Sequence, residues 1–197
     1  MEFKIFDKWD TKIQVNDPGL KRYINVNALL VPKTGNRYAE QRFWKSKLNI
    51  VERLINKLMI PGHRGKKHKL TSGRVTGKSM KAYNIVENVF KIIEQKTNKN
   101  PIEVFVRALE NSAPRDEITT IEYGGARYPQ AVECAPQRRI DIVLRQFVQG
   151  AYQKSFNKKV NMTQALAEEI LKAYNLDQTS TAIAKKLELE RQADSSR

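Results

Sequence analysis

The feature that most constrains the fold of this 197-residue chain is a set of apolar residues repeated at three- and four-residue steps. The clearest repeat predicts a helix with one continuous apolar face, formed by Ala82, Ile85, Val86, Val89, Phe90 and Ile93. Shorter repeats predict five more helices: at 48–59, from Pro101 to before Pro114, after Pro136, at 166–174 and at 183–187. Asn100 is expected to cap the helix that Pro101 begins. We therefore expect a mainly α fold, a single bundle of about six helices.

Between the third and fourth of these helices, the pattern changes to that of a β-hairpin over residues 117–135. β-Branched and aromatic residues occur in 118–123 and 126–134, on either side of a diglycine. Glycine supplies the positive φ that tight hairpin turns need. Pro129 restricts the second strand to an edge position, so the sequence predicts a two-stranded ribbon that projects from the bundle. Because such a ribbon is marginal in water, we expect it to lean on another surface or to reach for one.

Residues 1–40 lack a helical repeat and are expected to form an N-terminal extension or arm, with 41–197 as the helical domain. Within the arm, residues 23–31 alternate partly and lie between Pro18-Gly19 and Pro32. This pattern favours a short strand or an extended stretch.

The chain carries a formal net charge of +15, and its cations are concentrated in one segment. Between Pro61 and Lys81 there are seven Lys or Arg side chains and no Asp or Glu. Lys and Arg neutralise phosphates and release condensed counterions, so this segment predicts binding to RNA or DNA. Six of its cations are candidate phosphate contacts: Arg64, Lys66, Lys67, Lys69, Arg74 and Lys78.

Four arginines later in the chain extend this candidate surface around the hairpin base and the fourth helix: Arg115, Arg138, Arg139 and Arg145. Two of them have a structural alternative. Arg115 is close in sequence or in the expected fold to three carboxylates, Asp116, Glu117 and Asp141, and any of these can pair with it. For Arg139 the alternative is an ion pair within its own helix.

The hairpin tip is a further candidate contact, formed by Gly124, Gly125 and Ala126. Glycine permits close approach of the backbone to a nucleotide. Arg127 offers a planar cation and Tyr128 an aromatic face for stacking on a base. The alternative is that Tyr123 and Tyr128 only pack across the hairpin.

Catalytic and metal chemistry are poorly supported. Cys134 is the only cysteine, and the two histidines lie among cations, so we expect neither a disulfide nor a metal site. Gly73–Ser79 resembles a nucleotide-binding loop, but it has three residues between its glycines where the motif needs four. Glu168 and Glu169 fall within a predicted helix and are expected to face water. We therefore predict no catalytic residues, no cofactor and no enzyme activity.

The hydropathy of the chain bears on its location, and its charge leaves two other classes of protein to consider. No apolar run approaches the roughly 20 residues that span a bilayer, so we expect no membrane contact and a cytoplasmic protein. Two alternatives stay open on the residues alone: a general basic DNA- or RNA-binding protein, and a degenerate nucleotide hydrolase.

Seven stretches occur in one register along the chain: Asn49–Leu54, Gly77–Ser79, Ala108–Asn111, Pro114–Arg115, Gly124–Tyr128, Pro136–Arg139 and Ala184–Arg191. Together they resemble the small-subunit ribosomal protein seven family, in its archaeal and eukaryotic branch. The resemblance covers about residues 48–197. It departs at Ser79, where the family has a third basic residue after Gly77-Lys78, and at 61–75, which looks like an insertion relative to shorter relatives.

The resemblance implies a structural constituent of the small ribosomal subunit. Such a protein binds the 3′ major domain of small-subunit rRNA and nucleates assembly of the subunit head. The resemblance also implies that the hairpin lies near the path of exit-site tRNA and mRNA. Neighbouring head and platform proteins, such as small-subunit proteins nine and eleven, are its implied protein partners.

Overall fold

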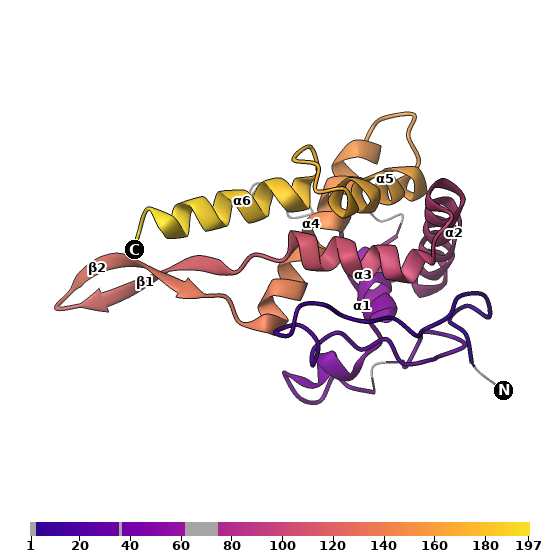
Figure 1. The fold of residues 1–197 in the computed structure, drawn as a ribbon, viewed down its shortest axis with the longest axis horizontal. Coiled ribbons are helices and arrows are strands. Elements are labelled where there is room, and N and C mark those ends of the chain that lie inside the picture. The colour runs from indigo at the N-terminus through magenta and orange to yellow at the C-terminus, as the bar shows by residue number, and fades with distance from the viewer. Residues whose placement is uncertain (1–2, 36, 62–74) are drawn as a thin grey trace.

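A computed structural model of the chain describes residues 3–35, 37–61 and 75–197. These ranges contain six α-helices, a short 3-10 helix and one two-stranded antiparallel sheet. The elements in chain order are η1 (Trp44–Lys47), α1 (Ile50–Leu58), α2 (Ser79–Thr97), α3 (Pro101–Ser112), β1 (Asp116–Tyr123), β2 (Ala126–Glu133), α4 (Pro136–Ser155), α5 (Met162–Tyr174) and α6 (Thr181–Asp194). The helices gather into one body and the hairpin projects from it (Figure 1). The predicted mainly α class is confirmed.

Two helices begin where asparagine side chains supply the first hydrogen bonds. The Asn49 side chain accepts a hydrogen bond from the Val51 backbone N–H at 2.9 Å. Asn100 accepts one from the Ile102 N–H at 3.0 Å, with Pro101 at the first helical position, as predicted. These caps satisfy backbone donors that a helix start leaves unpaired.

The core forms around α5, which packs against α2, α3 and α4. A chain of buried aromatic rings runs through it: the centroids of Phe90 and Phe105 are 5.9 Å apart, and those of Phe105 and Phe147 are 6.4 Å apart. All three come from helical positions that face inward, one each on α2, α3 and α4. The apolar repeats of the sequence therefore meet in a single core.

The N-terminal segment shares that core. Ile5, Trp9, Leu20 and Ile24 are buried against the bundle, and the Trp9 ring meets Phe90 edge-on at 5.7 Å. Residues 23–31 form no strand: Tyr23 ends a turn, and the single β-bridge of this stretch within the described chain joins Asn25 to Asn49. Of the two expected forms, the short strand is therefore absent from the described residues.

The hairpin has the register that its diglycine turn demands. Tyr123 pairs with Ala126, and both Gly124 and Gly125 adopt positive φ, at 59° and 81°. This is the arrangement of a two-residue primed turn, which matches the twist of the strands. From residue 119 to 130 every residue is exposed, so the outer part of the ribbon lies open to solvent.

The base of the hairpin leans on α6, which runs beside it (Figure 1). The Glu190 carboxylate accepts a hydrogen bond from the Arg115 backbone N–H at 3.1 Å. Arg197, just beyond the helix, forms an ion pair with Asp116 at the start of β1. The ribbon was expected to lean on another surface, and at its base it does so against α6.

Glu169 corrects one expectation. It does not face water: its side chain is fully buried and accepts hydrogen bonds from Lys154 Nζ at 2.5 Å and Ser180 Oγ at 3.0 Å. It also accepts from the Thr181 backbone N–H at 2.5 Å and the Thr181 hydroxyl at 2.6 Å. The first turn of α6 needs an acceptor, and a carboxylate brought over from α5 provides it. Glu169 and the start of α6 belong to different helices and meet only in the fold, so helical periodicity did not reveal the contact.

Candidate nucleic-acid interface

A groove of about 360 Å³ lies between η1, the end of α1 and the middle of α4. Its lining contains four cationic side chains and one carboxylate: Lys45, Arg53, Lys57, Arg145 and Asp141. These residues come from three elements that are distant in sequence. We call this set the α1–α4 groove.

The single carboxylate of the α1–α4 groove is already shared. Arg53 Nη2 donates to Asp141 Oδ1 at 2.9 Å, and the Lys45 ammonium pairs with the other oxygen. The Arg53 side chain is only 4% exposed, and it also donates to the Tyr23 carbonyl at 3.3 Å. The negative charge of Asp141 is therefore shared between the buried Arg53 guanidinium and the Lys45 ammonium, and no second carboxylate among the described residues lines the groove.

Lys57 and Arg145 pair with no carboxylate in the part of the chain that the structure describes. Burial lowers the pKa of Lys57, and the neighbouring charges of Arg145 and Lys45 lower it further, while Asp141 opposes them. A lowered lysine pKa means that the surroundings disfavour its positive charge. An anion entering the groove would offset that penalty.

The start of α4 carries two arginines with different surroundings. Arg138 is more than half exposed, and its Nε donates to Glu117 at 2.7 Å. Arg139 is buried: its Nε donates to the Pro114 carbonyl at 2.9 Å and its Nη2 to Asp17 at 2.7 Å. Its partner is thus a carboxylate of the N-terminal segment and not one of its own helix. The donors of Arg139 hold three parts of the chain together.

Arg115 is exposed, and none of its three expected partners is available to it. Asp116 pairs with Arg197, Glu117 with Arg138, and Asp141 with cations of the α1–α4 groove. The Arg115 guanidinium consequently forms no ion pair with a described residue. It lies at the hairpin base with its charge open to solvent.

The two faces of the outer hairpin differ in chemistry. Arg127 and Glu122 face each other across the strands, 3.6 Å apart. The opposite face is apolar, because Ile121 pairs with Tyr128 and Tyr123 projects beside them. Tyr123 is 82% exposed and Tyr128 is 58% exposed, so the cross-strand contact with Ile121 covers only part of the Tyr128 ring.

Lys78 is exposed at the residue before α2, where its carbonyl accepts a hydrogen bond from the Ala82 N–H at 3.1 Å. The other candidate cations of the basic segment, Arg64, Lys66, Lys67, Lys69 and Arg74, lie outside the described residues.

Sequence reasoning missed Lys45, Arg53 and Lys57. A signal was present, since Arg53 and Lys57 are four residues apart and so share one face of α1. In the sequence alone that face resembles a solvated one, because only the fold brings α4 and η1 alongside it.

Three observations bear on other chemistry. Within the described residues, no group of three His, Cys, Asp or Glu side chains is placed to hold a metal ion. Burial, together with Glu117, raises the pKa of Cys134 to about 11, so its thiol stays protonated and unreactive at neutral pH. Among the helices described, none has the length and apolar character to cross a membrane.

Comparison with known proteins identifies the relatives of this chain. The family model for ribosomal protein S7p/S5e matches residues 20–197. The small ribosomal subunit protein uS7 of Nanoarchaeum equitans is 52% identical over 198 residues and covers the whole of both chains. The uS7 protein of Methanosphaera stadtmanae is 46% identical over 196 residues, which is 99% of each chain. The chain therefore belongs to the ribosomal protein S7p/S5e family, as its motifs indicated, and is a structural ribosomal protein rather than an enzyme.

Proposed function

We propose that this protein binds the 3′ major domain of small-subunit rRNA and helps to nucleate assembly of the subunit head. The observation that carries the proposal is the α1–α4 groove, where four cations surround one carboxylate. The excess of positive charge is held partly out of solvent, and the protein itself does not neutralise it. A phosphodiester backbone supplies the missing negative charge.

Recognition in this proposal depends on shape more than on base edges. Lys57 and Arg145 contact phosphates in the groove, while Arg115 and Arg138 contact them at the hairpin base. Folded RNA is bound largely through its backbone, and cations at fixed separations select a matching junction. The basic segment between Pro61 and Lys81, including Lys78, extends the same surface.

Arg139 receives a different role from the one expected. Its donors already serve Asp17 and Pro114, so we propose that it positions the start of α4 and does not bind RNA. A buried guanidinium with two internal acceptors gains little from a third partner in solvent.

The hairpin is proposed to reach the path of exit-site tRNA and mRNA. Its outer part is exposed along both strands, and its two-residue turn leaves the backbone at Gly124 and Gly125 open. Tyr123 and Tyr128 offer ring faces to an unpaired base, and Arg127 offers a cation. Neighbouring head and platform proteins, such as small-subunit proteins nine and eleven, are proposed as protein partners from the family resemblance.

The test is binding to a transcript of the 3′ major domain, compared with an unrelated structured RNA and a DNA duplex across a salt series. We expect a preference of about a hundredfold for the transcript to persist at physiological salt, because specificity is what remains above the electrostatic term. Equal affinity for all three, lost together as salt rises, would assign the chain to the general nucleic-acid binders instead.

A further inference from the structure

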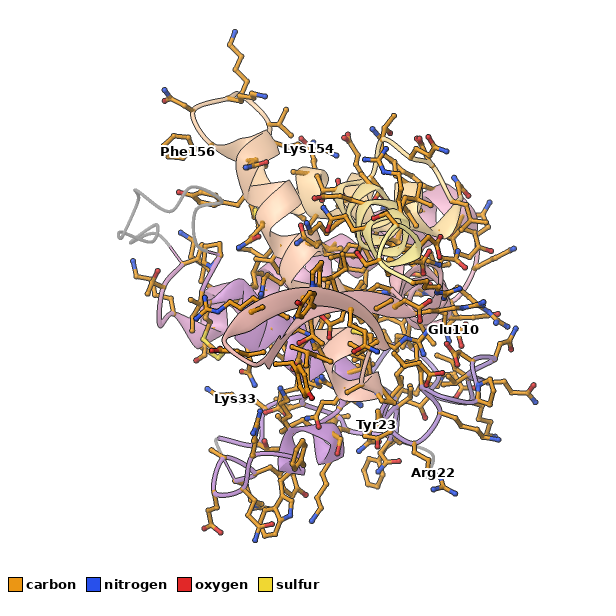
Figure 2. All side chains as sticks on the ribbon, turned by 90° about the vertical axis from the view of Figure 1, so that its left-hand side faces the viewer. Arg22, Tyr23, Lys33, Glu110, Lys154 and Phe156 are labelled. Atoms are coloured by element: carbon orange, nitrogen blue, oxygen red, sulfur yellow. The ribbon has the colours of Figure 1, made fainter. Side chains whose placement is uncertain are left out.

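Two aromatic residues are adjacent where η1 begins, and the helix geometry does not bury both. Phe43 is the residue before η1, and Trp44 is its first residue. Successive side chains of a 3-10 helix are about 120° apart, so a turn that packs one ring against the protein directs its neighbour outward. Trp44 is half-buried, whereas Phe43 is 66% exposed. η1 lies at the lower edge of the molecule in Figure 1 and, below Lys33, in Figure 2.

Each of the two rings holds one cation. The Arg42 guanidinium lies 5.5 Å from the centroid of the Phe43 ring, and the Lys47 ammonium lies 4.0 Å from that of Trp44. The second contact follows from the local geometry, because side chains three residues apart eclipse one another in a 3-10 helix. A cation over an aromatic face is held there by the ring quadrupole. We call Arg42, Phe43, Trp44 and Lys47 the η1 platform.

The charge of this stretch is mostly positive. Residues 37–47 carry four Lys or Arg side chains and one carboxylate, Glu40. Neither Arg42 nor Lys47 forms an ion pair with a residue that the structure describes, and both are exposed. Their positive charges are therefore open to an external anion.

The η1 platform is fixed to the protein and adjoins the α1–α4 groove. The Asn25 side-chain amide donates to the Lys47 carbonyl at 2.6 Å, and the Lys45 ammonium pairs with Asp141 of the groove. A 3-10 helix rises about 2 Å per residue, so Lys45 is only about 4 Å from Phe43 along the axis. A chain of phosphates that enters the groove therefore passes beside the exposed ring.

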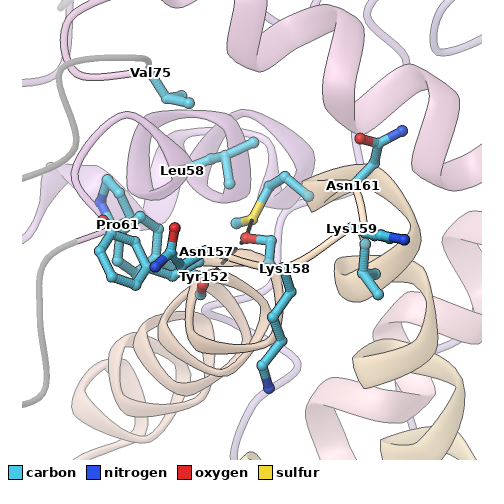
Figure 3. Close-up of a pocket in the computed structure, with 12 residues that line it drawn as sticks. Leu58, Pro61, Val75, Tyr152, Asn157, Lys158, Lys159 and Asn161 are labelled. Atoms are coloured by element: carbon cyan, nitrogen blue, oxygen red, sulfur yellow. Dashed lines mark hydrogen bonds between the residues drawn. The ribbon is translucent and has the colours of Figure 1, made fainter.

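The opposite end of α1 borders a different surface. Leu58 lines a cleft of about 570 Å³ together with Pro61 and Val75 (Figure 3). These two residues flank 62–74, which lie outside the described residues, so no ligand is assigned to that cleft. Ile50 and Leu58 are about 12 Å apart along the axis of α1, which separates the cleft from the η1 platform. The platform itself is formed and anchored by described residues.

We propose that the η1 platform stacks an unpaired base of the RNA strand whose phosphates occupy the α1–α4 groove. The base lies against Phe43, and the flanking phosphates contact Arg42 and Lys47. Every base has a π face that stacks on an aromatic ring, and cations beside the ring bind the backbone. An acidic peptide also complements the cations, but its carboxylates do not cover the ring as a nucleobase does. The proposal rests on the proposed function, since it assigns a further contact to the same class of ligand.

The experiment places 4-fluorophenylalanine at position 43 of the full chain and follows its fluorine NMR signal. We expect hexauridine to shift this signal with a midpoint at least about tenfold lower in concentration than an abasic RNA hexamer with the same phosphates. The double variant Arg42→Ala/Lys47→Ala should move both midpoints upward. No response to hexauridine, an equal midpoint for the abasic strand, or a lower midpoint for hexaglutamate would each overturn the proposal.

A second readout uses the transcript of the 3′ major domain. Phe43→Leu should weaken its binding by about 5- to 150-fold, the range that loss of one stacked base produces, while Phe43→Trp should bind as the wild type does. Because Phe43 is exposed, both variants should keep the urea midpoint of the wild type, so a change in binding reports on the ring and not on folding.

The two proposals fail in distinguishable ways. If the wild type does not prefer the transcript to unrelated RNA, the proposed function fails. If the wild type does prefer it and Phe43→Leu binds as tightly, only the η1 platform is wrongly assigned.

Discussion

Asp141, in the first half of α4, and Glu169, which pairs with Lys154 from the last turn of α4, are two carboxylates that bind cations. Their surroundings differ in how far the charges are balanced. Glu169 is fully buried and meets one lysine and three neutral donors, so charge and hydrogen bonds are balanced locally. Asp141 is partly exposed and stands among four cations, of which it pairs with two. The first site joins α4, α5 and α6, whereas the second leaves positive charge for an external partner.

The difference shows how to separate a structural charge cluster from a binding one. A buried ion pair is tolerated only when both members are satisfied within the protein. A cluster that remains unbalanced and half-exposed costs free energy in the isolated protein and recovers it when a counter-charge binds. The four variants that follow test this contrast, in order of decreasing effect.

The largest effect is expected for Glu169→Ala. It leaves Lys154 and the first turn of α6 without their acceptor, which should lower the free energy of unfolding by about 3–5 kcal/mol. Urea unfolding measures this, with Glu168→Ala as the matched control because Glu168 is exposed on the same helix. The contrast fails if the two variants unfold at the same urea concentration.

Asp141→Asn should have an intermediate effect, of about 1–3 kcal/mol, because it leaves the buried Arg53 guanidinium without a counter-charge. Binding of RNA should offset this loss of stability, whereas it should not offset the loss in Glu169→Ala. Thermal unfolding with and without the transcript should therefore show a larger gain for Asp141→Asn than for the wild type. An equal gain would mean that no phosphate enters the groove.

The double variant Lys57→Ala/Arg145→Ala should weaken transcript binding about tenfold, which is about 1.4 kcal/mol. It should also reduce the slope of log affinity against log salt by about two, one for each phosphate that the variant no longer neutralises. Its stability should rise slightly, because the variant removes two cations that disfavour each other in the isolated protein. Lys91→Ala/Lys96→Ala on α2 removes the same charge elsewhere and should leave the affinity nearly unaltered.

The smallest effect concerns the pair of Asp17 and Arg139. Burial raises the pKa of Asp17, but hydrogen bonds and charge from Arg139 outweigh it, so the pKa lies below its usual value of 3.8. The stabilisation is therefore present above pH 3.8 and is lost as the pH falls through the folded-state pKa.

Because Asp17 is partly exposed, the loss should be at most about 1 kcal/mol. Urea midpoints at pH 5 and pH 3 measure it. Asp17→Asn should show a smaller decrease between the two pH values than the wild type. An identical decrease in both proteins would place the acid sensitivity in other carboxylates.

The elements that local patterns specify were predicted well. The stripe from Ala82 to Ile93 formed the inner face of α2, and Asn100-Pro101 began α3 where the capping rule placed it. The diglycine set both the turn and the register of the hairpin. In each of these cases the controlling interactions lie within a few residues of one another.

The surroundings of the candidate cations were predicted only in part. Arg138 and Arg145 are exposed on α4 as expected, but Arg139, a candidate from the same helix, turns inward to Asp17. Lys57 was not a candidate at all, since nothing near it in sequence distinguishes it from a solvated lysine. Its significance comes from Arg145 and Lys45, which reach it from other elements.

By itself, the sequence determined the number and faces of the helices, the hairpin turn, the excess of positive charge and, through its ordered motifs, the family. These properties depend on backbone preferences and short-range periodicity, or on composition. The tertiary structure alone decided which charges are paired. Coulomb and desolvation energies depend on distances and burial between residues far apart in the chain, so Asp141, Glu169 and Arg139 acquire their roles only when α4, α5 and the N-terminal segment are packed together.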